Sequence, residues 1–125
     1  MRVHHIAMRT ASIEHLGAFY EDVLGFELIG GKPGYSRWYR MGAAVLMLEQ
    51  RVESEVPLSS GNMEFLGFAV TVAERTHLTE RLEAAGVSIE EESANTTYFR
   101  DPDGRRLGVS HFDFSALDSG DPPSA

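Results

Sequence analysis

Apolar and polar positions along the chain follow one order of predicted elements twice. Val3–Arg9 alternates like a strand, and apolar residues then recur at helical spacing as far as Gly25. A glycine suits the left-handed residue just beyond a helix end. The same patterns return with Met63–Val72 and reach a second such glycine at Gly86. The chain is therefore predicted to contain two copies of one βαβββ unit.

In the first copy, the pattern predicts a helix over Ser12–Leu24, with Ser12 as its N-cap. Gly30–Gly34 is predicted to be a loop, because glycine and proline dominate it. The strands predicted after this helix are Phe26–Ile29, Arg37–Met41 and Ala43–Gln50.

In the second copy, the apolar spacing predicts a helix over Arg75–Ala85. Asp101–Gly104 is predicted to be a tight turn, since Pro suits its second position and Gly the position with positive φ. The strands predicted after this helix are Val87–Glu91, Thr97–Arg100 and Arg106–His111.

The two copies also agree in length. Gly25 and Met47 are 22 residues apart, and so are Gly86 and Gly108. We expect a single domain over residues 1–113, with unit one at 1–50, a linker at 51–62 and unit two at 63–113. Residues 114–125 are expected to be a polar C-terminal tail, unstructured from Ala116 onward.

Composition narrows the function classes. The 125 residues carry a net charge of −8, which argues against nucleic-acid binding, because that needs clustered Lys and Arg. There is no cysteine, so disulfides and thiolate chemistry are excluded. We expect no membrane span and no signal peptide, and therefore a cytoplasmic protein.

These copies resemble the vicinal oxygen chelate superfamily, which includes glyoxalase I, extradiol dioxygenases and bleomycin-resistance proteins. The resemblance rests on the His-Ile-Ala opening at His5, the segment Ala18–Phe26 and the run Tyr98–Gly104, and it covers roughly Arg2–Phe112. It implies an α+β fold, in which the two tandem units form a cupped, mostly antiparallel mixed sheet (the glyoxalase/bleomycin resistance/dioxygenase fold). The enzymes of the family hold a divalent metal at the base of the cup.

The resemblance implies that most metal-ligand positions have lost their ligands. His5 stands where the metal enzymes have a histidine, and it is the only ligand position retained. The second-unit His or Gln falls at Gly67, the last-strand Glu at Gly108, and the further Glu of glyoxalase I at Met47. A thioether does not replace a carboxylate for a hard divalent cation. We therefore expect no metal site of the family kind and no cofactor.

Strand parity predicts which side chains face the cup. His5 and Glu49 are the candidate catalytic residues, and Thr71 is expected beside the site. We expect Arg40 and Arg100 to need a carboxylate partner, either Glu49 or an anionic ligand. The predicted ligand-binding residues are Trp38, Arg40, Met47, Tyr98, Arg100 and Ser110.

Two classes of function remain open at this point. The first is a metal-free binding protein that holds a small aromatic or amphipathic compound, as the bleomycin-resistance branch sequesters a drug. The alternative is an enzyme of the lyase, isomerase or dioxygenase type that acts on a small carbonyl or aromatic substrate. That enzyme would use His5 or Glu49 as a general acid or base, or a divalent metal in a rearranged site. The expected partners are the small molecule and, from the resemblance, a second copy in a homodimer.

Overall fold

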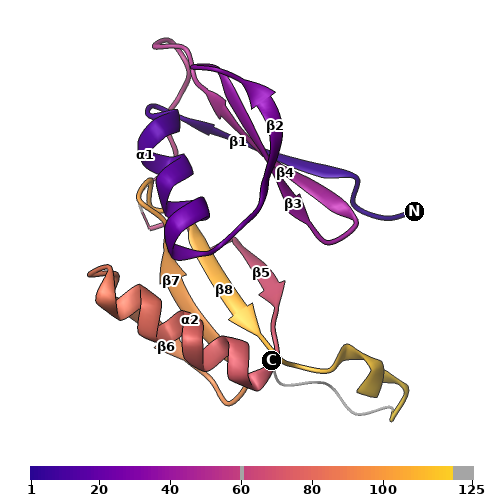
Figure 1. The fold of residues 1–125 in the computed structure, drawn as a ribbon. Helices are drawn as coiled ribbons and strands as arrows, with labels where there is room; N and C mark the ends of the chain where they lie inside the picture. Colours follow the sequence, from indigo (N-terminus) through magenta and orange to yellow (C-terminus); the bar gives the residue numbers. More distant parts are fainter. Residues whose placement is uncertain (60, 120–125) are drawn as a thin grey trace. The chain divides into compact units, whose positions relative to one another are not determined.

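Each half of the chain folds as a four-stranded mixed sheet with a helix against it (Figure 1). A computed structural model describes residues 1–59 and 61–119, which divide into two compact units at Ser59. The predicted α+β class and the two βαβββ units are confirmed.

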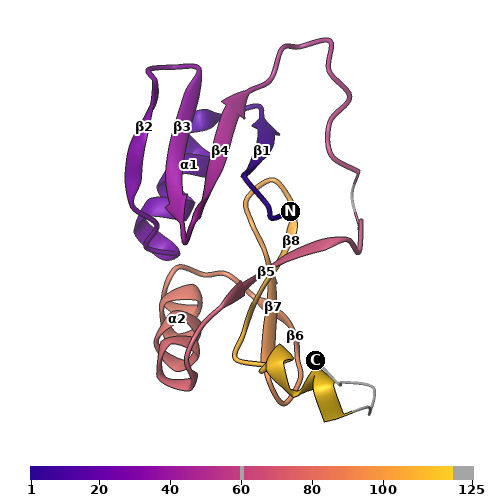
Figure 2. The ribbon, with the colours of Figure 1, turned by 90° about the vertical axis from the view of Figure 1, so that its right-hand side faces the viewer.

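The first sheet has the strand order β1-β4-β3-β2, which Figure 2 shows with the strands side by side. The first and last strands, β1 and β4, are parallel, and the other neighbours are antiparallel. The elements are β1 (His5–Thr10), α1 (Ile13–Ala18), a π-helical turn (Phe19–Val23), β2 (Leu28–Lys32), β3 (Ser36–Met41) and β4 (Ala44–Gln50).

The predicted helix Ser12–Leu24 is in fact an α-helix that continues as a π-helical turn. Ser12 caps it as expected, because its side-chain oxygen accepts a hydrogen bond from the His15 amide. In the π-helical turn the Leu24 amide donates to the Phe19 carbonyl, five residues back, at 3.1 Å. Phe19 and Tyr20 are both buried there, so this turn directs two adjacent rings into the core.

The predicted loop over Gly30–Gly34 is wrong in its first three residues, because β2 runs on through Lys32. Gly31 has a φ of +129°, and a Cβ there would lie 2.4 Å from the Ser36 carbonyl oxygen. The strands approach so closely at this point that only glycine fits. Composition alone predicted a loop, whereas the glycines serve a bulged strand pair.

The helix-side face of the first sheet forms the core of its unit. Tyr39 is fully buried, and its hydroxyl donates to a carboxylate oxygen of Glu21 at 2.8 Å. Arg37 donates to the same oxygen at 3.2 Å, so the carboxylate ties β3 to the helix. The Tyr20 hydroxyl contacts the sulfur of Met8 on β1 at 3.5 Å.

The second sheet repeats the first with the order β5-β8-β7-β6, and β5 is parallel to β8. Leu78 and Leu82 of its helix are buried, as are Phe99 and Leu107 of its strands. The elements are β5 (Phe65–Ala69), α2 (Val72–Ala84), β6 (Ile89–Glu92), β7 (Thr96–Arg100), β8 (Arg106–Ser110) and a short 3-10 helix (Phe114–Ser119).

The second helix begins at Val72, three residues before the predicted start at Arg75. Thr71 is its N-cap and exchanges hydrogen bonds with Glu74 in a capping box. The Thr71 hydroxyl therefore caps the helix, and its expected place beside the functional site stays a prediction.

Arg75 fastens α2 to the loop between β6 and β7. Its guanidinium donates to the carbonyl oxygens of Ser93, Ala94 and Thr96, and to the Thr97 hydroxyl at 2.7 Å. It also lies 3.2 Å from Nε2 of His111. His111 thus lies on the helix side of the second sheet.

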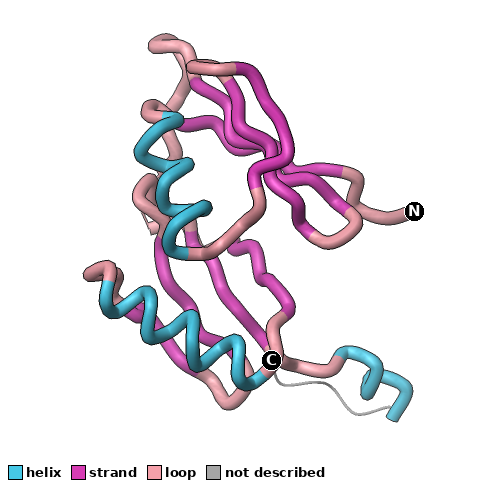
Figure 3. Tube along the Cα trace, viewed as in Figure 1, coloured by secondary structure: helices cyan, strands magenta, loops and turns pink. Residues whose placement is uncertain are grey.

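The tail differs from its prediction over its first residues. Phe114–Ser119 is a 3-10 helix, drawn in cyan near the C-terminus in Figure 3. Residues 120–125 lie outside the described part of the chain. Across the described residues, no helix is long and apolar enough to span a bilayer.

We predict that Tyr39→Phe lowers the free energy of unfolding at neutral pH by about 1.5 kcal/mol, because it removes a hydrogen bond to a carboxylate. Burial, and then the Glu21 contact, raises the pKa of Tyr39 from 10.0 to about 12. A raised tyrosine pKa stabilises the fold fully below pH 10, and this contribution is lost as the pH rises through 12.

Urea unfolding between pH 8 and pH 11.5 checks this prediction. The wild-type protein should lose stability more steeply above pH 10 than Tyr39→Phe. Tyr35→Phe, which alters a half-exposed ring, should keep the wild-type slope; identical slopes for all three proteins would contradict the role of Tyr39.

Candidate functional site

The face of each sheet opposite its helix carries almost all the predicted site residues. Residues paired across neighbouring strands project to the same side of a sheet, so the strand register defines these faces. We call them the first and second open faces. The first open face consists of His5, Ala7, Arg9, Ser36, Trp38, Arg40, Val45, Met47 and Glu49. The second consists of Phe65, Gly67, Ala69, Thr96, Tyr98, Arg100, Arg106, Gly108 and Ser110.

The two open faces match row by row. In the first, Ala7, Met47 and Trp38 pair in one row across three strands. In the second, the corresponding row is Gly67, Gly108 and Tyr98. Met47 and Gly108 are therefore true counterparts, as their spacing from the helix-end glycines indicated.

The residue of the second unit that corresponds to His5 depends on whether strand rows or sequence motifs are compared. His5 lies in the next row, opposite Val45, and the matching row of the second sheet begins with Phe65. By register the counterpart of Gly67 is Ala7, not His5 as the opening motif indicated. The alignment by motif and the alignment by strand register therefore differ by two residues in the second unit.

Trp38 dominates the first open face. The side chain is 41% exposed, although it lies on an inner strand of the sheet. Its ring leans over β2, where a Cβ on Gly30 would lie 3.3 Å from Cε3 of the indole. Gly30 thus leaves room for the ring against the sheet, and Met47 lies beside Trp38 on β4.

Charged side chains flank this row on both sides. Arg9 binds Glu55 through two hydrogen bonds, of 2.9 and 2.8 Å, and lies 3.5 Å from Glu49. On the other side, Arg40 pairs with Glu27 at 2.9 Å, and both side chains are largely exposed. The carboxylate for Arg40 is therefore Glu27, and the expectation that Glu49 takes this role is wrong.

The two candidate catalytic residues share the first open face but do not meet. His5 pairs with Val45, and Glu49 is four residues further along β4, a separation of about 13 Å at the strand rise. Nδ1 of His5 lies 2.9 Å from Nδ1 of His4, and Glu49 is paired with Arg9. This arrangement offers no acid–base couple within reach of one substrate proton.

The second open face also carries Phe65, which the sequence did not indicate as a site residue. Its ring lies over the two glycines: a Cβ on Gly67 would be 3.3 Å from its Cε2, and one on Gly108 would be 3.4 Å away. Tyr98 meets the ring edge-to-face, with centroids 5.2 Å apart. The space that ligand side chains would enter at these two positions is therefore next to an aromatic ring.

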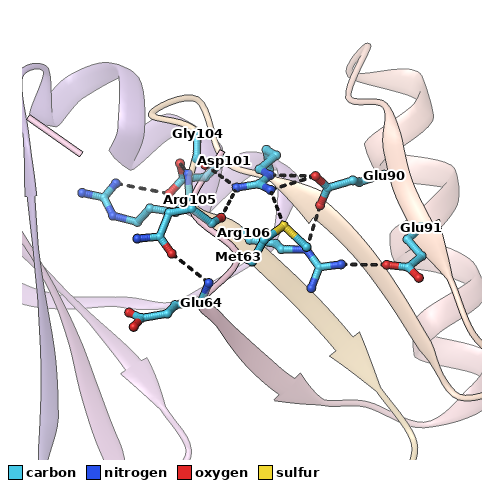
Figure 4. A network of polar contacts seen from close by, with 10 residues as sticks. Met63, Glu64, Glu90, Glu91, Asp101, Gly104, Arg105 and Arg106 are labelled. Carbon is cyan, nitrogen blue, oxygen red and sulfur yellow. Dashed lines mark hydrogen bonds and ion pairs between the residues drawn. The ribbon is translucent and has the colours of Figure 1, made fainter. Parts of the chain in front are cut away.

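Arg106 closes this face with an ion-pair network (Figure 4). It is only 7% exposed, its guanidinium lies 4.2 Å from the Tyr98 ring centroid, and it donates to Glu90 and Glu91 at 2.9 and 2.8 Å. Arg100 also donates to Glu90, at 2.8 Å. Hydrogen bonds from Arg100 and then from Arg106 hold the pKa of Glu90 below its usual value.

The network identifies the carboxylate partner of Arg100, and it includes two residues that the sequence analysis did not predict for the site, Arg106 and Glu90. The carboxylate partner of Arg100 is Glu90, not Glu49. The sequence could have indicated Arg106 as a residue of the open face, since it has the same strand parity as Gly108. It could not have indicated Glu90, because the β6 register shifts by one residue between Ile89 and Glu91.

Ser110 is also occupied within its own sheet. Its hydroxyl oxygen accepts a hydrogen bond from the Thr96 hydroxyl at 2.7 Å and another from the Phe112 amide at 3.2 Å. Of the predicted ligand-binding set, Trp38 and Met47 are the members with a large apolar surface that no ion pair covers.

The residues present do not fit the metal of the family. Within residues 1–59 and 61–119, no three His, Cys, Asp or Glu side chains come together as a ligand group. Every buried side-chain nitrogen or oxygen in these ranges has a hydrogen-bond partner, so no buried polar atom there needs a metal ion to satisfy it. His5 is exposed, and Gly67 and Gly108 offer no donor.

Comparison with known proteins places this geometry in a family. A profile of the Glyoxalase/Bleomycin resistance protein/Dioxygenase superfamily matches residues 2–109. The chain belongs to this superfamily. No curated protein sequence matches the chain.

Solved structures show the same fold at low sequence identity. The fosfomycin resistance protein FosX from Listeria monocytogenes superposes with a TM-score of 0.78 at 17% identity, over 91% of this chain and 93% of that one. Lactoylglutathione lyase from Agrobacterium tumefaciens gives 0.68 at 23% identity, over 86% and 91%. An integron cassette protein from V. cholerae gives 0.70 at 26% identity, over 90% and 96%.

We predict that Glu55→Gln destabilises the protein at pH 7 but not near pH 2. Hydrogen bonds from Arg9, followed by that of the Val52 amide, lower the pKa of Glu55 from 4.5 to about 2. A lowered carboxyl pKa stabilises the fold above pH 4.5, and this contribution is lost as the pH falls through 2.

The measurement is denaturant unfolding at pH 7, 4.5 and 2.5. Glu53→Gln is the matched control, because it removes the same charge from the same segment without touching Arg9. Equal stability of the two variants at pH 7 would show that Glu55 does not anchor its segment to the first open face.

Proposed function

We propose that this superfamily member binds small aromatic or amphipathic compounds on its open faces, each face within its own unit, and uses no catalytic metal. The observation that carries the proposal is Trp38, the only tryptophan, half-exposed on the first open face beside Met47. A ring that served only the core would be buried like Tyr39. Aromatic surface with a few polar groups around it is what a small-molecule site offers.

The aromatic ring of Trp38 and the net charge of the chain favour a cationic compound. Arg9 faces two carboxylates, Glu49 and Glu55, while Arg40 faces Glu27. Arg51 also lies near Glu55, so the charged groups around Trp38 balance one another. An aromatic ring attracts cations through its electron-rich face, and the net charge of −8 acts in the same direction.

The residues proposed to contact the compound are those predicted from the sequence. Trp38 supplies stacking, Met47 adaptable apolar contact and Arg40 a polar rim. The second open face is a separate binding surface in this proposal, on which Tyr98 supplies the ring and Arg100 and Ser110 hold the surrounding network in place. We further propose a homodimer, as the family membership favours, which sedimentation equilibrium would test.

The binding proposal is tested with two dyes, cationic rhodamine 6G and anionic 1-anilinonaphthalene-8-sulfonate. We expect rhodamine 6G to bind more tightly, and Trp38→Ala to weaken its binding at least tenfold in a fluorescence-anisotropy titration. Leu28→Ala is the control, because Leu28 is equally exposed but pairs with Tyr39 on the helix side; it should leave dye binding unchanged.

Unfolding of the same variants separates a pocket ring from a core ring. Removing a core aromatic side chain costs about 3–5 kcal/mol of stability. Trp38→Ala should cost clearly less while it abolishes binding. Severe destabilisation with dye binding intact would show that Trp38 belongs to the core and that the proposal has the wrong face.

The proposed absence of a catalytic metal gives a separate prediction. Nickel, zinc, manganese or ferrous iron should not raise the midpoint of thermal unfolding. A metal that bound only the folded state would add about 2.7 kcal/mol at a hundred times its dissociation constant. A rise of several degrees that His5→Ala removes would overturn the prediction.

A further inference from the structure

The Phe65 ring occupies a box that is complementary to an aromatic ring. Its floor is Gly67 and Gly108, where ring atoms Cε2 and Cδ2 lie within van der Waals distance of the Cβ that either glycine lacks. Tyr98 stands edge-to-face against the ring, and the Arg106 guanidinium lies 5.6 Å from its centroid. A Cβ on either glycine would press on the ring, so the missing side chains make the room that it uses.

The box is built independently of Phe65. Arg106 is held over Tyr98 by Glu90 and Glu91, and Tyr98 lies on an inner strand next to Gly108. None of these contacts passes through the Phe65 side chain. Removing the phenyl ring should therefore leave the floor and walls in place.

Phe65 itself is weakly held. It is the first residue of β5, which is an edge strand, and its side chain is 48% exposed. About half of the side chain is therefore in contact with solvent. Departure of the ring from the box is a change of side-chain rotamer, which breaks no hydrogen bond between strands.

The charges of the box indicate what replaces the ring. Two guanidinium groups, Arg100 and Arg106, meet two carboxylates, Glu90 and Glu91. The positive and negative charges of the box balance, so a carboxylate or an ammonium group of a ligand would find no unpaired opposite charge there. What it offers is a flat apolar floor, one aromatic wall and one guanidinium plane, which suits an uncharged aromatic ring.

We propose that this box is a binding subsite for one uncharged aromatic ring of a small molecule, which Phe65 fills when no ligand is present. The proposal rests on the proposed function and specifies part of it. It also gives the glycines at the two lost metal-ligand positions a role, since a side chain at either would narrow the box.

The test uses indole as the probe, with benzoate and benzylammonium as charged comparisons. In Phe65→Ala the box is vacant, so we expect indole to bind at least tenfold more tightly than to the wild type, and more tightly than either charged probe. Amide signals of Gly67 and Gly108 should shift in a ¹H–¹⁵N correlation spectrum. Phe114→Ala removes a similarly exposed ring outside the sheets and should gain nothing.

Phe65→Leu covers the case in which Phe65→Ala fails to fold, since it keeps apolar bulk but lacks a ring; it should bind indole with a smaller gain. Tyr98→Leu added to either variant should abolish the gain. No gain in any variant, or shifts away from Gly67 and Gly108, would overturn the subsite.

The two proposals fail in different ways. Loss of the subsite with Trp38-dependent dye binding intact leaves the proposed function standing. Indole binding at the glycines without any dye binding would instead reject the first open face as the site and retain the subsite.

Discussion

Parallel pairing of the first and last strands within each unit is the constraint on which the rest of the structure depends. The β1–β4 and β5–β8 pairs require a crossover connection, and the helices α1 and α2 lie within those crossovers. Each helix therefore covers one side of its sheet and leaves the other open. The register of the same pairs then decides which residues share an open face, and in which row.

The same scaffold has been used in two different ways. On the first open face a large ring is exposed among charged pairs at the surface, as with Trp38 and the Arg40–Glu27 pair. On the second, Arg106 is buried against Tyr98 with both of its carboxylates in place. Surface pairs of the first kind contribute little to stability, whereas a buried guanidinium must keep its partners. The charged side chains of the first face are thus less firmly tied to one another than those of the second.

The repeat, the strand faces and the ends of the helices were predictable from the sequence, because each follows from a local period or from a glycine with positive φ. Gly25 and Gly86 end their helices at φ values of 79° and 77°. The partners of the arginines were not predictable. Glu27 comes just before β2, and Glu90 lies at the register shift of β6. Strand parity therefore does not predict on which side of the sheet either carboxylate lies. Phe65 was missed because motif matching aligned the second unit two residues away from its structural register.

The contact between Arg75 and His111 fixes the position of a hydrogen atom. A guanidinium is always a donor, so Nε2 of His111, 3.2 Å away, must present its lone pair. The ring hydrogen of the neutral imidazole therefore resides on Nδ1. Arg75 is itself held in place by carbonyl acceptors at the start of β7 and in the loop before it. The tautomer of one histidine is in this way dictated by the helix that packs beside it.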